Sequence, residues 1–340
     1  MPSLFTHQLI ADYVLQKLDE DLQQKIEKPE IYSLGAQGAD LFFFYRLHAG
    51  KKNNLGGKLH KINIYQTFSA LERQLWRMQN KYDDYQKAQQ ATSEQNETLQ
   101  QDAMHTLKDI KTFQSYIAGY ITHYVADTVF HPFIYAMEEK FLQLQPNWKG
   151  KRHVYIENDI DSYLLKKYKN LQPSKYKLSF TVAEEDLPSL CTTLRVLCYE
   201  AGYPNFTFQE LKQILKRINL FARLTRDEKQ FRRFFLHSIE SAFFLPHIFS
   251  VTMHRNSVDE ICVNSKHEEW INPSCGKKVS TESADELFER AVAESITVLS
   301  AFFECVEQNK ELPKEIFNKH FLSGLDESIP HIIPQKKGKT

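Results

Sequence analysis

The stretch His123-Tyr-Val-Ala-Asp127-Thr-Val-Phe-His131-Pro132 places a histidine, an aspartate and a second histidine at positions i, i+4 and i+8. In an α-helix, side chains with this spacing project from one face over successive turns. Imidazole nitrogens and carboxylate oxygens are the ligands that zinc prefers when no thiolate takes part. The stretch therefore predicts a helix that supplies part of a metal site.

Further residues of the same chemistry lie on both sides of this stretch. His153 and Glu157 form another i, i+4 pair, and three single residues precede the helix. The candidate ligands are His7, Asp40, His60, His123, Asp127, His131, His153 and Glu157. One zinc ion takes about four ligands, so eight candidates favour a cluster of ions. Asp127, central in its run, is the natural carboxylate to bridge two of them.

Each candidate has an ordinary alternative when it is considered alone. His7 could be a surface or core histidine, Asp40 could cap a helix after the glycine-rich turn, and His153 with Glu157 could be an ion pair. His48 also follows Asp40 and is a rival of His60 as a ligand. We prefer His60 because the glycine turn before it would deliver it to the start of a helix.

Composition excludes several classes of protein. The chain has 340 residues, of which 43 are basic and 43 acidic, so it has no general field that would attract nucleic acid. We expect no stable nucleic-acid partner. Five scattered cysteines without a CxxC pair indicate reduced thiols. The N-terminus shows no signal sequence and no apolar run approaches the roughly 20 residues that span a bilayer, so the sequence predicts a cytoplasmic protein.

Hydrophobic periodicity is helical throughout, and no sustained alternation typical of strands occurs, which predicts an all-α fold. We expect a turn at 31–40, a buried segment at 41–45, a loop at 51–58, a polar solvent-facing stretch at 88–103 and a turn at 147–150. The predicted helices cover residues 4–26, 62–88, 104–131, 132–146, 153–169, 182–201, 207–222, 226–250 and 281–309. We predict a zinc-binding helical core at 1–170, a helical extension packed on it at 171–334 and a flexible tail at 335–340.

In its order of motifs, the chain resembles the zinc-dependent phospholipase C family, whose fold is shared with single-strand nucleases. The family pattern has a histidine, a Gly-x-x-Gly-Pro-Asp motif, a second histidine, a helical His-x-x-x-Asp with a further histidine, and His-x-x-x-Glu. The corresponding residues here are His7, Gly35-Ala-Gln-Gly-Ala-Asp40, His60, His123 with Asp127 and His131, and His153 with Glu157. The resemblance covers roughly residues 1–170.

The resemblance implies two or three zinc ions. Asp40, His60, His123 and Asp127 would hold one ion, and His131, His153 and Glu157 would hold a second. His7 and the bridging Asp127 would hold a third. In the family, the third ion also binds the amino group of an N-terminal tryptophan, which this sequence does not show.

The implied activity is that of a metal-dependent phosphoesterase, with Asp40 as the residue that orients or deprotonates the attacking water. The substrate would be a phosphoester such as a phospholipid, a nucleotide or another phosphodiester. Two alternatives stay open: a helical binding or scaffold protein with a structural metal cluster, and a single-strand nuclease or nucleotidase. We expect Asp161, one turn beyond Glu157, to accept a hydrogen bond from a metal ligand or to form a salt bridge, and not to be a ligand itself.

Overall fold

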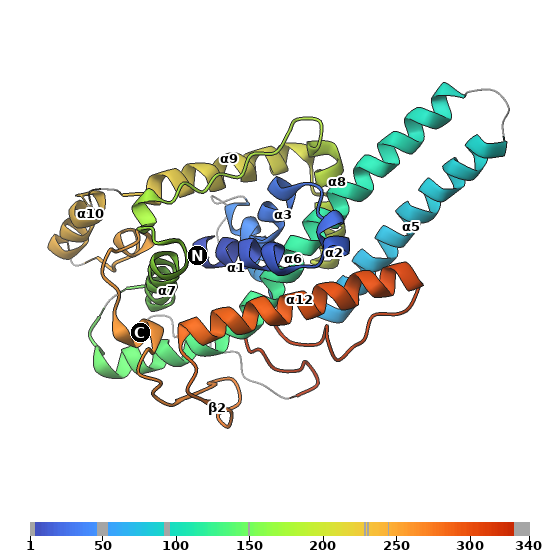
Figure 1. The fold of residues 1–340 in the computed structure, drawn as a ribbon. Coiled ribbons are helices and arrows are strands. Elements are labelled where there is room, and N and C mark those ends of the chain that lie inside the picture. Colours follow the sequence, from blue (N-terminus) through green and yellow to red (C-terminus); the bar gives the residue numbers. More distant parts are fainter. Residues whose placement is uncertain are drawn as a thin grey trace.

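The fold is all-α, as predicted, and is organised around the long helix α6 (Glu97–Leu144), which runs through the molecule (Figure 1). The computed structural model describes residues 4–45, 54–91, 96–148, 150–227, 229, 231–243 and 245–329. Helices α1, α3, α5, α7, α8 and α12 all pack against α6. All residues of α6 from Phe113 to Met137 are buried, apart from the partly buried Gln114. This helix therefore forms the axis of the core.

The other helices are α1 (Leu4–Lys17), α2 (Glu20–Gln24), α3 (Pro29–Gly35), α4 (Leu55–Leu59), α5 (Ile64–Ala91), α7 (Arg152–Lys169), α8 (Leu187–Glu200), α9 (Phe208–Thr225), α10 (Phe231–Ala242), α11 (Glu260–Val263) and α12 (Ala284–Gln308). Short 3-10 helices are η1 (Gly38–Phe44), η4 (Pro173–Lys175) and η5 (Ser250–Thr252). Among the described residues, no helix is both long and apolar enough to cross a membrane.

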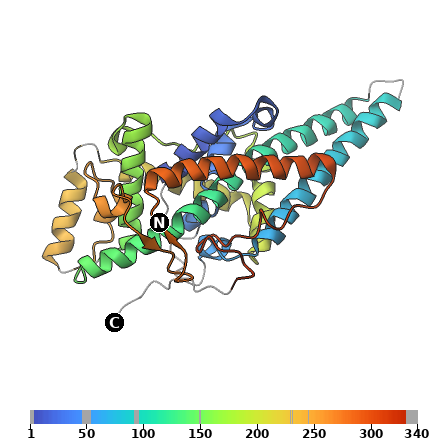
Figure 2. The same ribbon diagram turned by 60° about the horizontal axis from the view of Figure 1, so that its bottom comes forward.

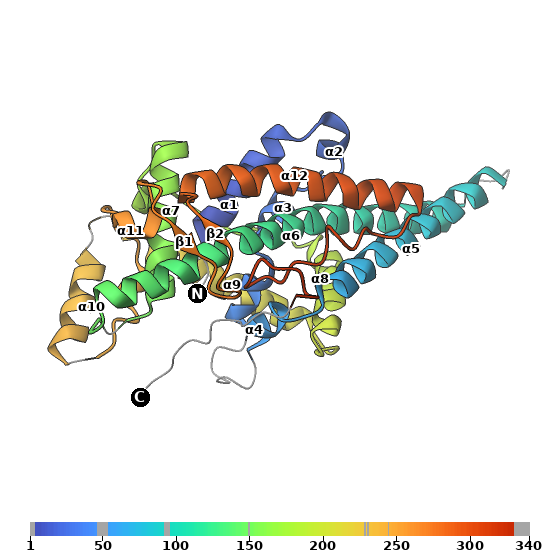
Figure 3. The same cartoon turned by 90° about the horizontal axis from the view of Figure 1, so that it is seen from below.

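Helix α5 and the first half of α6 form an antiparallel pair that extends away from the rest of the molecule, while α10 lies at the opposite end (Figures 1 and 2). The predicted polar stretch 88–103 lies at the tip of this pair, where its described residues are helical and mostly exposed. Helix α12 lies alongside α6 (Figure 3). Buried residues of the N-terminal and C-terminal halves belong to one continuous hydrophobic cluster.

Two glycines let α3 and α6 approach to backbone contact. A Cβ added to Gly119 would lie 2.1 Å from the carbonyl oxygen of Tyr32, and one added to Gly35 would lie 2.3 Å from that of Tyr116. Such distances are shorter than any van der Waals contact, so each position requires glycine. The close crossing of the two helices brings the segment after Gly35 onto the histidine-bearing part of α6.

The predicted join between two helices at Pro132 is wrong, because α6 continues through the proline. Pro132 cannot donate a hydrogen bond to the carbonyl of Thr128. That carbonyl faces Gly324, where an added Cβ would meet its oxygen at 2.3 Å. Burial of α6 on this side by the C-terminal segment therefore outweighs the local preference of proline to end a helix.

Other helix boundaries differ from prediction for local reasons. The predicted helix 4–26 is broken because Asp19 caps α2, its side chain accepting from the backbone N–H of Leu22 at 2.8 Å. The predicted helix 226–250 is confined to Phe231–Ala242, since Pro246 follows and Glu240 binds the backbone of the next segment. The segments 41–45 and 153–169 are a buried segment and a helix, as predicted.

One strand pair departs from the purely helical prediction. Strands β1 (Trp270–Ile271) and β2 (Val279–Ser280) form a short antiparallel hairpin, in which Trp270 is buried against Phe133 of α6. The five cysteines are free, which agrees with the predicted reduced thiols. The predicted tail 335–340 lies outside the described residues.

Candidate metal centre

The structure brings all eight candidate ligands into one buried cluster. His7 comes from α1, Asp40 from η1 and His60 from the end of α4, whereas α6 and α7 supply the remaining five residues. Each of the eight is between 0 and 8% exposed. Burial of this many ionisable groups is costly unless they are paired or bind metal, so the cluster needs a physical explanation.

The first group surrounds Asp40 and Asp127. His60 Nε2 lies 3.3 Å from Asp40 Oδ1 and 3.2 Å from Asp127 Oδ2, and His123 Nε2 lies 3.4 Å from the same Asp127 oxygen. The ligand atoms of Asp40, His60 and His123 all lie within 4.8 Å of one another. This is the spacing of donors around a single ion, and the resemblance assigned these residues to the first zinc.

The second group contains His131, His153 and Glu157, whose ligand atoms also lie within 4.8 Å of one another. His153 Nε2 is 3.2 Å from Glu157 Oε1, and the rings of His131 and His153 stack with centroids 5.7 Å apart. The third group is formed by His7, His123 and Asp127. His7 Nε2 lies 3.4 Å from Asp127 Oδ1, so the two oxygens of Asp127 face different groups.

Some ligand atoms lack a hydrogen-bond partner although they are buried. They are Nε2 of His123 and Oε2 of Glu157. Buried polar atoms are almost always hydrogen-bonded, and an atom without a partner calls for an explanation such as a bound ion. Nitrogen and carboxylate oxygen donors from five segments, pointing at common positions, fit zinc.

Contacts behind the ligands orient the imidazole rings. Nδ1 of His60 lies 2.7 Å from the carbonyl oxygen of Gly56, and Nδ1 of His131 lies 3.1 Å from that of Phe321. A proton on Nδ1 directs the lone pair of Nε2 toward the cluster. Glu138 Oε2 lies 3.1 Å from Nδ1 of His153 and has the same effect there.

The sequence analysis did not identify these three orienting contacts. Glu138 follows His131 by seven residues on α6, so helical spacing could have indicated it. The carbonyl groups of Gly56 and Phe321 leave no trace in residue type, because every residue carries a carbonyl.

Burial and neighbouring charges divide the histidines into two kinds. Burial, together with neighbouring histidines, lowers the pKa of His123 and His131, which keeps these rings neutral and available as ligands. Burial acts in the same direction on His60, but the carboxylates of Asp127 and Asp40 raise its pKa to about 10. The pKa of His153 is raised to about 9 against burial by Glu157 and Glu138.

We expect zinc binding to release protons. In the metal-free protein, His60 and His153 carry protons at neutral pH, because the pKa of each lies above 7. A ligating imidazole must be neutral, so the ion displaces these protons and the apparent zinc affinity rises with pH up to about 9–10. Calorimetric titration in buffers of different ionisation enthalpy measures the number released. A binding enthalpy that is the same in every buffer would contradict this expectation.

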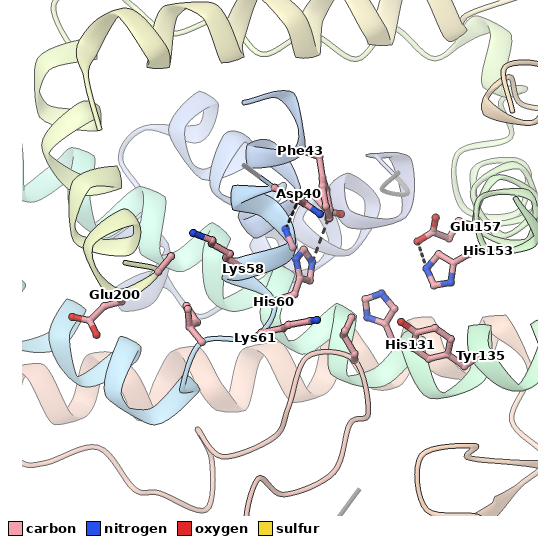
Figure 4. A pocket seen from close by; sticks show the side chains of 15 residues that line it. Asp40, Phe43, Lys58, His60, Lys61, His131, Tyr135, His153, Glu157 and Glu200 are labelled. Atoms are coloured by element: carbon pink, nitrogen blue, oxygen red, sulfur yellow. Dashed lines mark hydrogen bonds and ion pairs between the residues drawn. The ribbon is translucent and has the colours of Figure 1, made fainter. Parts of the chain in front are cut away.

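A cleft of about 700 Å³ opens over the cluster (Figure 4). Asp40, His60, His131, His153 and Glu157 line it, so ligands of the first two groups are accessible from one space. Lys58 and Lys61, on either side of His60 in sequence, add positive charge to its wall, and Tyr135 and Glu200 add further polar groups. A smaller cavity behind the cluster is lined by His7, Asp127 and Glu157 among others.

The segment that carries His60 has a different structure from the one predicted. The glycine segment before it, expected as a loop, forms the short helix α4 in its described part, and His60 ends this helix instead of beginning the next. Asn54 caps α4 by accepting from the N–H of Gly57 at 2.9 Å. The rival residue His48 lies outside the described residues.

Asp161 accepts hydrogen bonds at the start of α1, the helix that carries His7. It accepts from the N–H and the hydroxyl of Thr6, at 2.7 and 2.6 Å, and it lies 2.9 Å from Nε2 of His254. A carboxylate at a helix N-terminus is favourable. Asp161 thereby fixes the turn that carries His7.

Comparison with known families agrees with this geometry. The family model for zinc-dependent phospholipase C matches residues 6–197. The chain therefore belongs to the zinc-dependent phospholipase C family. No curated protein matches, and no solved structure matches. Membership supports a zinc-dependent phosphoesterase.

Proposed function

We propose that this chain hydrolyses a phosphodiester, with a phospholipid as the favoured substrate, in the cleft above the eight-residue cluster. The observation that carries the proposal is the coincidence of three donor groups with an open cleft. A structural metal cluster needs no access to solvent, whereas here two of the donor groups line a space large enough for a phosphorylated headgroup.

The donor groups suggest how zinc would be held. Asp40, His60, His123 and Asp127 would bind one ion, and His131, His153 and Glu157 a second. A third would lie between His7 and Asp127. When bound, zinc would neutralise phosphoryl oxygens and lower the pKa of water.

Asp40 is the proposed residue that orients and deprotonates the attacking water. It lines the cleft and is only 5% exposed, so its carboxylate acts in surroundings with little competing solvent. Asp40 Oδ1 faces His60 at 3.3 Å, while Oδ2 faces His7 at 3.6 Å. This position beside the ligand cluster supports a role in proton transfer as well as in metal binding.

Lys58 and Lys61 are proposed to bind the phosphate of the substrate. Both line the cleft next to His60 and both are exposed, so a phosphate in the cleft can reach them without conformational change. Positive charge beside the reacting phosphoryl group stabilises the negative charge in the transition state. The phenol of Tyr135, also in the cleft wall, is a further hydrogen-bond donor.

The test combines metal analysis with hydrolysis of bis-(p-nitrophenyl) phosphate. We expect two or three zinc ions per chain, and metal-dependent hydrolysis that His123→Ala reduces by at least about a hundredfold, since this substitution removes a ligand shared by two groups. The metal centre would be refuted if the purified protein carried less than one zinc per chain and if added zinc neither bound to it nor stabilised it.

Zinc binding without hydrolysis of any phosphodiester would instead indicate a scaffold with a structural cluster. Cleavage of single-stranded nucleic acid in preference to lipid would indicate a nuclease.

A further inference from the structure

Helix α10 turns an apolar face toward solvent. Phe231, Phe234, Phe235 and Phe243 are 67, 70, 55 and 70% exposed. Phe231, Phe234 and Phe235, at positions i, i+3 and i+4, share one side of the helix, and Phe243 follows directly after its last residue, Ala242. The rings of Phe231 and Phe235 stack with centroids 6.4 Å apart, so the exposed phenyl groups of the helix form a stripe.

Two charged side chains of the same helix, Arg233 and Glu240, are partly or fully buried while its phenyl groups are exposed, which is the reverse of an ordinary surface helix. Glu240 is 3% exposed and accepts from the backbone N–H groups of Ile248 and Phe249 at 3.0 and 2.7 Å. It also binds the hydroxyl of Ser250. These bonds hold α10 in an orientation that keeps its phenyl groups outside.

Neighbouring segments extend the apolar area. Leu245 and Phe249, directly after α10, are also largely exposed. Leu224 of α9 is half exposed, and its carbonyl accepts from the guanidinium of Arg232 at 3.3 Å, which places it beside α10. We call Phe231, Phe234, Phe235, Phe243, Leu245 and Phe249 the α10 surface. Exposed patches of this kind mark interaction sites.

The exposed charged residues of the segment 223–249, which carries the α10 surface, have one sign in the part of the chain that the structure describes. Arg223, Lys229 and Arg232 are exposed. The described acidic residues of this segment, Asp227 and Glu240, are buried, and each accepts a backbone hydrogen bond. Phenyl groups bordered by arginine and lysine are typical of helices that lie in the interface of an anionic bilayer.

We propose that the α10 surface docks onto an anionic phospholipid surface. A two-fold contact with a second copy of the chain would place the basic border of one subunit against that of the other, which is unfavourable. A lipid surface accepts the phenyl groups among its acyl chains and pairs the basic residues with its headgroups.

The docking proposal goes beyond the proposed phosphodiester hydrolysis and stands without it. None of the residues of the α10 surface lines the cleft or belongs to the ligand cluster. Loss of docking should therefore leave the hydrolysis of a soluble substrate unchanged. Failure of one proposal can accordingly be distinguished from failure of the other.

The test is cosedimentation of the full, metal-loaded chain with vesicles of phosphatidylcholine and phosphatidylglycerol in equal parts. We expect the chain to bind these vesicles, and the binding to become weaker when salt is added. Binding to vesicles of phosphatidylcholine alone should also be weaker. The double variant F234S/F235S should bind at least about tenfold more weakly, because two phenyl groups no longer enter the lipid. The matched control Met104→Ser removes an equally exposed apolar side chain from the first half of α6, which extends away from α10, and should bind normally.

Hydrolysis of bis-(p-nitrophenyl) phosphate and the circular dichroism spectrum should be the same for all three proteins. The proposal is overturned if F234S/F235S binds vesicles as well as the unaltered chain. It is also overturned if the unaltered chain does not bind vesicles. If that chain then elutes as a dimer and the double variant as a monomer, the α10 surface is an interface with a second copy. If both elute as monomers, the α10 surface is assigned to a protein partner.

Discussion

Replacing Asp127 with asparagine is expected to lower phosphodiester hydrolysis about a thousandfold and to remove metal from two of the three donor groups. Asp127 Oδ2 faces His60 and His123, at 3.2 and 3.4 Å, while Oδ1 faces His7 at 3.4 Å. A carboxylate can therefore serve two ions from one side chain. Asparagine keeps the shape but loses the charge and one of the two oxygens, so a bridge can no longer form. Zinc content per chain and the rate of hydrolysis measure the effect.

The matched control for this substitution is Glu139→Gln, which makes the same change of charge at an exposed position on the same helix. It should keep full zinc content and activity. The bridging role is contradicted if Asp127→Asn retains the zinc content of the unaltered chain. In that case the carboxylate is a neighbour of the ions and not a ligand.

Replacing Gly38 with alanine is expected to remove zinc and activity although no ligand is replaced. A Cβ at this position would lie 2.0 Å from Cδ2 of His123, and the backbone φ of Gly38 is +46°. The alanine therefore pushes the imidazole away from the cluster and also adopts an unfavourable left-handed conformation. The combined cost is on the order of 2–4 kcal/mol of unfolding free energy. Denaturant unfolding and zinc content report the two effects.

Gly202→Ala separates the clash from the backbone effect. Gly202 has φ of +73°, and no other atom lies within 4 Å of an added Cβ. This control should lose only about 1–2 kcal/mol and keep its zinc. Equal zinc content in Gly38→Ala and the unaltered chain would mean that His123 can shift without loss of the centre.

The sequence predicted the parts of the centre that depend on helical spacing. The pairs His123 with Asp127 and His153 with Glu157 are adjacent because an α-helix places i and i+4 on one face, whatever the rest of the fold does. How His7, Asp40 and His60 reach those pairs could not be predicted from spacing. It depends on the crossing of α3 and α6 at Gly35 and Gly119, and on Asp161 at the start of α1. Cytoplasmic location and the domain boundary at residue 170 stay predictions.

Where the sequence misled, long-range packing outweighed a local preference. Proline at 132 ends a helix in isolation, but Gly324 and its neighbours cover α6 there, and the helix continues. The stripe on α10 has the period of a helix buried on its apolar side. Its outward orientation follows from Glu240, which accepts hydrogen bonds from the backbone of Ile248 and Phe249. Hydrophobic periodicity within the helix contains no information about these contacts.

The contact between His131 and the carbonyl of Phe321 has a consequence for modularity. These residues are 190 positions apart in the chain, and the carbonyl lies 3.1 Å from the ring nitrogen. The family match ends at residue 197, so the matched part alone does not contain everything that orients the ligands. A fragment cut at that boundary would keep all eight donors and the carbonyl of Asp127, which lies 3.2 Å from Nδ1 of His131, yet lose the carbonyl of Phe321 beside the same nitrogen. The centre is assembled from both halves of the chain.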